Sequence, residues 1–397
     1  MHYLKDSESI QNLASIYRNH LNKTIDFWTQ NAIDYEEGGY FCHLDREGNI
    51  IDTDKGVWQT GRFAWLLAHL YNNYDKSSQW LKLAKHGIDF LAEHGFDKDG
   101  KMFFHLNRAG EPVRKRRYAF SESFAVLAWA EYAKATQNNK FADRAIELFN
   151  NYIKFNTNKK YINPKYIEAI RPTKGIGYPM IGIATAQILR ETVNYQKADR
   201  MIQKWVDEIK TDHLNSEYKA VVETVGPNGE FIDHVRGRTL NPGHAIEAAW
   251  FIMKEGKYRK DSRTIDLGTK MLDWMWEIGW DKEYGGILYF KDVTGHPVQE
   301  YWHDMKFWWP HCEAIIASLM AYNLTGDKKY AQMHKLVHDW TFNHFPDEKY
   351  GEWFGYLHRD GRISVDSKGN IWKGPFHIPR MLFISLNIVD EILQKKS

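Results

Sequence analysis

The sequence has few of the features that define secreted, membrane-spanning or nucleic-acid-binding proteins. Its only cysteines are Cys42 and Cys312 among 397 residues, too few for a disulfide framework and typical of a reducing cytoplasm. No apolar run approaches the ~18 residues of a membrane helix, and no basic segment precedes an apolar one at the N-terminus. The net charge is only +2, so we expect neither nucleic acid nor a membrane as a partner.

Several common catalytic signatures are absent as well. The sequence contains no HExxH or Cys/His metal spacing, no Gly-x-Ser-x-Gly elbow, no Walker loop and no dinucleotide fingerprint. We therefore expect no metal and no required cofactor. Aromatic residues, in contrast, reach 15% of the chain. Aromatic rings stack on the apolar faces of sugars, but large cores also consume them, so composition alone leaves a carbohydrate ligand open.

Short segments with the same pattern recur along the chain. Each places aromatic and β-branched residues beside an Asx or glycine turn, which predicts a small β-hairpin. The segments are 37–48, 100–110, 284–295 and 350–361, with a weaker one at 221–231. They are spaced about 60–65 residues apart, or about twice that, which fits a helix pair plus a hairpin as the repeating unit. About six such units fill the chain.

The stretches between the hairpins have helical periodicity, with apolar residues at i, i+3 and i+4. The predicted helices are 9–30, 57–73, 78–95, 118–136, 140–155, 178–194, 197–211, 243–255, 262–280, 309–324, 328–344 and 377–394. Almost wholly apolar helices alternate with two-faced ones, which is what two concentric rings require. No linker divides the chain. We predict one all-α domain over residues 1–397, an (α/α)6 barrel of twelve helices with short β-hairpins at its rim.

Three predicted helices in the second half begin with a proline or follow one closely, and carry a histidine near that start. Proline is favoured in the first turn of a helix, where its missing N–H costs nothing. The histidines are His244, His311 and His377. If these helices form the inner ring they run parallel, and their N-termini bring the histidines toward one space. The helix dipole there favours neutral imidazole, the form that a base requires.

Glu247 lies three residues after His244 on the same helix face, where it would orient the imidazole. No compact set of acidic ligands accompanies the three histidines, which argues against a metal site. A glycosidase would instead use a pair of carboxylates at the mouth of the barrel. Glu247 and Glu313 offer such a pair, so hydrolysis stays open as a weaker alternative.

Longer motifs resemble one known family. They are 58–62, 120–122, 241–244 with Glu247, 306–311 with Glu313, 350–356 and 374–380. In order and over nearly the whole chain, they look like N-acylglucosamine 2-epimerases, and this resemblance implies the same (α/α)6 barrel. The family interconverts N-acetylglucosamine and N-acetylmannosamine. The alternatives are a neutral-sugar 2-epimerase or aldose-ketose isomerase on mannose or glucose, and a non-catalytic carbohydrate-binding protein.

The resemblance also implies roles for single residues. His244 and His377 would be the two acid/base catalysts at carbon 2, Arg62 would stabilise the oxyanion, and Glu247 would tune His244. The remaining substrate contacts implied by the resemblance are Trp58, Glu122, Trp309, His311, Glu313 and Trp353. Another histidine stands near the position of Met180 in related isomerases, and its absence here favours the acylglucosamine branch.

The basic segment 158–175 resembles the part of the family implicated in binding ATP, which acts as an activator and is not consumed. Lys160 and Arg171 are the candidate contacts, although the Gly-Lys that opens this segment in some members is missing. The family is commonly dimeric, so a homodimer is expected.

Overall fold

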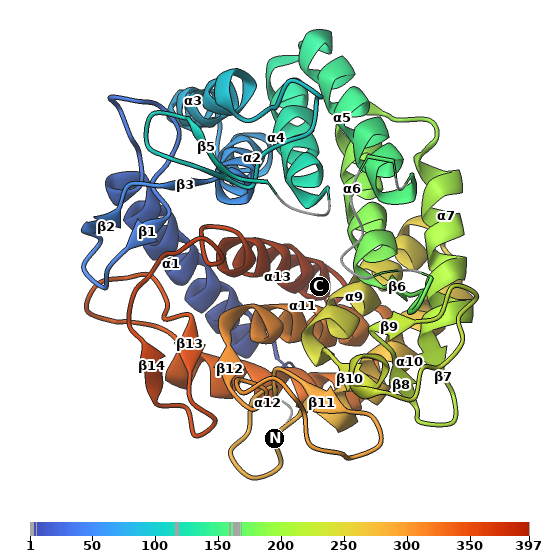
Figure 1. Ribbon diagram of the computed structural model, residues 1–397. Coiled ribbons are helices and arrows are strands. Elements are labelled where there is room, and N and C mark those ends of the chain that lie inside the picture. The colour runs from blue at the N-terminus through green and yellow to red at the C-terminus, as the bar shows by residue number, and fades with distance from the viewer. Residues whose placement is uncertain are drawn as a thin grey trace.

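The computed structural model describes residue 4 and residues 6–115, 119–158, 160–161, 167 and 169–396. Over this part of the chain the helices surround a central axis (Figure 1). They are α1 (Ser7–Asn31), α2 (Val57–Asn73), α3 (Ser78–His94), α4 (Phe120–Thr136), α5 (Asn139–Thr157), α6 (Gly177–Val193), α7 (Ala198–Glu208), α8 (Val235–Arg238), α9 (Pro242–Arg259), α10 (Ser262–Gly279), α11 (Trp308–Thr325), α12 (Lys328–His344) and α13 (His377–Gln394).

The long helices form two rings, which confirms the predicted barrel. The inner ring consists of α2, α4, α6, α9, α11 and α13, and almost every residue of α4 and α11 is buried. The outer ring consists of α1, α3, α5, α7, α10 and α12, which bury one face only. Each outer helix reverses the chain, so the inner helices run parallel and their N-terminal ends meet at one mouth. None of the described helices combines the length and apolarity needed to cross a membrane.

The structure differs from the predicted helices at two places. The predicted helix 197–211 is α7 followed by a π-helical turn, η1 (Ile209–His213). The short helix α8 was not predicted, because four residues are too few to show an apolar period. Both differences lie between α7 and α9, where the chain returns to the rim before it enters the inner ring again.

Short strands line the rim. They are β1 (His43–Leu44), β2 (Ile50–Asp52), β3 (Lys55–Gly56), β4 (His105–Leu106), β5 (Pro112–Arg114), β6 (Lys174–Gly175), β7 (Leu214–Asn215), β8 (Ala220–Val221), β9 (Thr224–Val225), β10 (Thr239–Leu240), β11 (Lys291–Asp292), β12 (Lys306–Phe307), β13 (Tyr356–Leu357) and β14 (Ile363–Val365). All pairs are antiparallel: β1–β2, β3–β4–β5, β6–β9, β7–β8, β10–β11 and β12–β13–β14.

Three predicted hairpins are present as β1–β2, β4–β5 and β13–β14. The other two predictions were wrong in their pairing. The 284–295 segment supplies β11, which pairs with β10 about 50 residues earlier, and the 221–231 segment supplies β8 and β9, which pair with β7 and β6. Turn residues fix where a chain bends, but a strand of two residues takes its partner from tertiary packing.

Three aspartates tie the rim together in the same way. Each accepts from a buried lysine of a neighbouring strand or loop and from an arginine in the turn of another hairpin. The sets are Asp34 with Lys55 and Arg108, Asp281 with Lys306 and Arg359, and Asp347 with Lys368 and Arg46. Because a buried charge must be paired to be tolerated, these sets hold the hairpins over the ends of the inner helices.

Candidate active site

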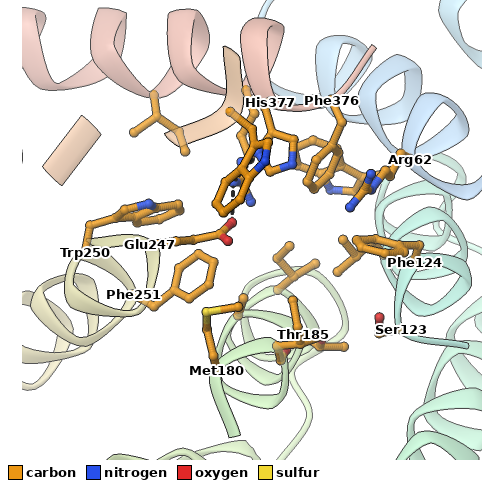
Figure 2. Close-up of a pocket in the computed structure, with 18 of the residues that line it drawn as sticks. Arg62, Ser123, Phe124, Met180, Thr185, Glu247, Trp250, Phe251, Phe376 and His377 are labelled. Atoms are coloured by element: carbon orange, nitrogen blue, oxygen red, sulfur yellow. Dashed lines mark hydrogen bonds and ion pairs between the residues drawn. The ribbon is translucent and has the colours of Figure 1, made fainter. Parts of the chain in front are cut away.

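A cavity of about 1170 Å³ follows the axis of the barrel from the rim to the far ends of the inner helices. Figure 2 shows Arg62, Phe376 and His377 along one side of it, with Glu247, Phe251 and Met180 across from them. Because the inner helices are parallel, residues of their first turns come together here although they are far apart in the sequence. Trp58 and Trp309 also line the cavity, as the sequence predicted for them.

His244 lies in the first turn of α9 and faces this cavity. The side chain of Asn241 accepts from its backbone N–H at 3.1 Å, and Pro242 fits the first helical position. The ring packs against Trp309, with 5.0 Å between centroids, and its Nδ1 lies 3.0 Å from Oε1 of Glu223. Burial has the largest single effect on the pKa of His244 and lowers it. The charge and hydrogen bond of Glu223, with smaller contributions from Glu247 and Glu313, together outweigh burial, so the net shift is upward. The side chain is 35% exposed.

His377 opens α13 and is more enclosed, with its side chain only 10% exposed. Its Nδ1 lies 2.7 Å from Oε1 of Glu313 and 3.3 Å from Nη2 of Arg380. A carboxylate can only accept, so Nδ1–H donates to Glu313 and the guanidinium lies beside that bond. Burial, and then the positive charge of Arg380, hold the pKa of His377 well below the usual histidine range. This histidine is therefore neutral at physiological pH.

Arg380 joins two carboxylates below His377. Its Nη2 lies 2.6 Å from Oε1 of Glu247 and 2.6 Å from Oε1 of Glu313, whose second oxygen accepts from Trp250 Nε1 at 2.8 Å. Ligand-type atoms of Glu247, Glu313 and His377 lie within 4.8 Å of one another, a spacing that can hold a metal ion. The guanidinium already supplies a positive charge to both carboxylates, so the group is complete as a hydrogen-bonded cluster.

Arg62 presents a buried positive charge to the cavity. Its guanidinium lies 4.0 Å from the ring centroid of Phe124, 4.7 Å from that of Phe376 and 5.6 Å from that of Trp58. Burial lowers its pKa to about 9, which still leaves it charged at neutral pH. Among the described residues no carboxylate lies within salt-bridge distance of Arg62. A cation held on aromatic rings and facing a cavity is suited to an anion that forms there.

Four residues predicted to contact substrate do not line the cavity: Glu122, His311, Trp353 and Glu313. Glu122 accepts from the backbone N–H of Met102 at 2.9 Å, and burial raises its pKa to about 7. His311 is fully buried: Nδ1 donates to the carbonyl of Phe307 at 2.6 Å and Nε2 accepts from the N–H of Ile287 at 2.9 Å. These side chains support the rim loops from behind.

Trp353 is also completely buried, and its Nε1 lies 3.3 Å from Nδ1 of His20. The predicted sugar platform therefore packs between the outer helices α1 and α12. Glu313 also lies behind the cavity wall, but it reaches the site through His377. Glu247 lines the cavity but bonds Arg380, so the predicted direct contact with His244 is wrong and Glu223 makes it instead.

The two candidate nucleotide contacts, Lys160 and Arg171, are exposed and do not line the cavity. Residues 159, 162–166 and 168 of the same segment lie outside the described residues. The pKa of His234 is lowered, first by its burial and then by the positive charges of Arg171, Arg236 and Arg238.

Sequence reasoning missed two residues of the site. Arg380 stands three positions after His377, so helical spacing alone could have placed it beside that ring. Glu223 comes from the rim, 21 residues before His244 and outside the inner ring, and no periodicity connects the two. The cavity mouth also carries Tyr289, Tyr356 and Trp372, for which the sequence had indicated no role.

Comparison with known proteins gives the chain its relatives. The model of the N-acylglucosamine 2-epimerase (GlcNAc 2-epimerase) family matches residues 39–378. N-acylglucosamine 2-epimerases of Bos taurus and Homo sapiens are each 32% identical to it, over 98% of this chain and 94% and 93% of theirs. The solved cellobiose 2-epimerase of Bacillus thermoamylovorans B4167 superposes with a TM-score of 0.82 at 21% identity, over 95% of this chain and 99% of that one, and so shares the fold.

Proposed function

The chain belongs to the N-acylglucosamine 2-epimerase family, and from this premise we propose that it interconverts N-acetylglucosamine and N-acetylmannosamine. One observation carries the proposal beyond family membership. Two histidines, each held at Nδ1 by a glutamate, face one cavity from adjacent positions beside Trp309. Holding both rings by Nδ1 leaves both Nε2 atoms for substrate, and inversion at a carbon needs a base on one side and an acid on the other.

The chemistry follows from the protonation of the two rings. The sugar opens to its aldehyde, and neutral His377 removes the proton on carbon 2. The electron pair of that C–H bond forms the C1–C2 double bond as the carbonyl pair moves to oxygen 1. Arg62 stabilises this oxyanion from its place on the aromatic rings. His244 then donates its proton to the other face of carbon 2, and the carbonyl re-forms on the inverted sugar.

The wall of the cavity suits a sugar. Trp58 and Trp309 present broad apolar surfaces, and Tyr289, Tyr356 and Trp372 add more aromatic area at the mouth. Such surfaces bind the C–H faces of a pyranose, while the charged groups at the centre engage its oxygens. The two carboxylates that a glycosidase would need, Glu247 and Glu313, instead share Arg380, which argues for epimerisation over hydrolysis.

The test is proton NMR of N-acetylmannosamine incubated with the enzyme in heavy water, with mannose in a parallel sample. We expect N-acetylglucosamine with deuterium at carbon 2, because the base exchanges its proton with solvent. Conversion of mannose to glucose or fructose, without turnover of the N-acetyl sugar, would transfer the assignment to the neutral-sugar branch. Absence of turnover in both samples would overturn the proposal. An Arg62→Met sample serves as the control for contaminating activity.

We further propose that ATP activates the enzyme from the segment that contains Lys160 and Arg171. Support comes from the exposed positive charge near Arg171 and from the position of β6, which forms the end of this segment and pairs with β9 beside Glu223. Activity with and without ATP in Lys160→Ala and Arg171→Ala tests this, and undiminished activation in both variants would contradict it.

Finally, we propose a cytoplasmic homodimer. The unpaired, buried thiols of Cys42 and Cys312 fit a reducing compartment, and the family resemblance supports the dimer. Analytical ultracentrifugation and cell fractionation provide the measurements.

A further inference from the structure

The two cavity histidines receive their carboxylates from different parts of the molecule. Glu313, which holds His377, lies in the inner helix α11. Glu223, which holds His244, lies between strands β8 and β9 on the rim and does not line the cavity. His244 therefore depends on a side chain that the barrel itself does not position.

The backbone on either side of Glu223 is nevertheless firmly held. Its carbonyl accepts from the N–H of Ile176 at 3.0 Å, and β9 pairs with β6 through Thr224 and Val225. On the other side, the N–H of Val222 donates to the carbonyl of His213 at 2.8 Å, and His213 Nδ1 returns a bond of 2.8 Å to the carbonyl of Val222. These contacts hold the backbone from which the Glu223 carboxylate reaches Nδ1 of His244.

We propose that Glu223 is a positioning residue for the epimerase reaction, one that fixes His244 as the proton donor of the resting enzyme. The inference rests on the proposed function. The carboxylate keeps the proton on Nδ1, so that Nε2 points to the sugar, and it stabilises the imidazolium form. Glu223 has the role that the sequence had suggested for Glu247, whose carboxylate instead accepts from Arg380.

Other charges also reach His244, and they define what the test must separate. Glu247, on the same helix, and Glu313, on α11, both favour its protonated form, but more weakly than Glu223. His377 on α13 packs against the same Trp309 ring as His244 and is neutral. Removing the charge of Glu223 should thus remove the largest contribution that raises the pKa of His244, because the other two carboxylates are already compensated by Arg380.

The experiment compares Glu223→Gln, Glu223→Asp and Glu217→Gln with the wild type. Glu217 lies exposed in the adjacent turn between β7 and β8 and provides the matched control. For Glu223→Gln we expect kcat to fall about 10- to 100-fold, the usual range for losing a carboxylate that orients a functional histidine. KM should change less than twofold, because Glu223 does not line the cavity. The kcat of Glu223→Asp should lie between those of Glu223→Gln and the wild type.

The pH profile separates this role from a structural one. Loss of the negative charge lowers the pKa of His244, so the alkaline limb of kcat/KM should move to lower pH in Glu223→Gln and stay in place in Glu217→Gln. A Glu223→Gln profile superimposable on that of the wild type would overturn the inference.

An NMR titration keeps the inference distinct from the proposed function. The ring nitrogens of His244, assigned by comparison with His244→Asn, can be followed without any substrate. A lower pKa in Glu223→Gln would support the link between Glu223 and His244 even if no sugar were turned over, and an unchanged pKa would refute it even in an active enzyme.

Discussion

The His244 and His377 ends of the cavity begin alike and differ in their partners. Both histidines lie in the first turn of a parallel inner helix, where the dipole disfavours imidazolium. Yet the pKa of His244 is raised and that of His377 is lowered. Glu223 acts on His244 without a competing cation in salt-bridge distance among the described residues, whereas Arg380 neutralises Glu313 and adds a positive charge beside a more buried His377.

This difference teaches that helix position brings two histidines together, but the neighbouring charges give them different roles. A pair of identical rings in identical surroundings would share one proton without preference. Here His244 is the ring that is protonated first and His377 is the neutral ring. A two-base inversion can begin from this arrangement.

The largest effects should come from removing either ring. In His244→Asn and in His377→Asn we expect epimerisation to fall about 10³-fold or more, because in each variant one face of carbon 2 lacks its proton-transfer group. The two variants should nevertheless differ. In heavy water, each should exchange the carbon 2 proton of only one epimer, the one whose proton faces the remaining histidine. NMR with each epimer separately measures this, and exchange of both epimers by both variants would contradict the two-sided arrangement.

Removal of the buried positive charge of Arg62 should have the next largest effect. Arg62→Met is expected to lower kcat about 10²- to 10³-fold, the scale for losing one oxyanion donor. Stability should not fall in parallel, since the variant replaces a buried guanidinium by an apolar side chain among the rings of Phe124 and Phe376. Steady-state kinetics and urea unfolding together measure this. A less stable variant with normal kcat would identify Arg62 as structural.

A smaller effect should follow from weakening the hydrogen bond between Glu313 and His377. Glu313→Gln removes the carboxylate that bonds Nδ1 but keeps an oxygen there, so kcat should fall about tenfold to 10²-fold. Loss of the negative charge lowers the pKa of His377 further. The acid limb of kcat/KM, where His377 gains its proton, should therefore move to lower pH, and the alkaline limb set by His244 should move less, because Glu313 contributes only weakly to the pKa of His244. Movement of the alkaline limb alone would show that the two ends are assigned the wrong way round.

The barrel could be predicted from the sequence because apolar periodicity reports each helix without knowledge of its neighbours. The joint position of His244 and His377 followed from the parallel inner ring. His311 shows the limit of that argument. It stands two residues after Trp309, about 200° around α11, so once Trp309 faces the cavity the ring of His311 must point away from it. The proline before His311 marked the start of a helix but not its rotation.

The rest of the site could not be predicted because it depends on tertiary contacts. Glu223 reaches His244 only because β9 pairs with β6, and strands of two residues leave no periodic trace. Glu247 was placed beside His244 by helical spacing, but the competing guanidinium of Arg380 attracts its carboxylate more strongly. Spacing identifies which side chains can meet, and charge decides which of them do.

The smallest effect on catalysis should come from a residue that lies outside the cavity. Trp353→Phe is expected to leave kcat/KM within about twofold of the wild type, because Trp353 packs under the rim and not in the cavity. Its cost should appear in stability, at about 1–2 kcal/mol, since the shorter ring leaves space beside Phe342 and removes the donor to His20. Urea unfolding and sugar kinetics separate the two. A tenfold loss of kcat/KM without loss of stability would restore Trp353 as the sugar platform that the sequence suggested.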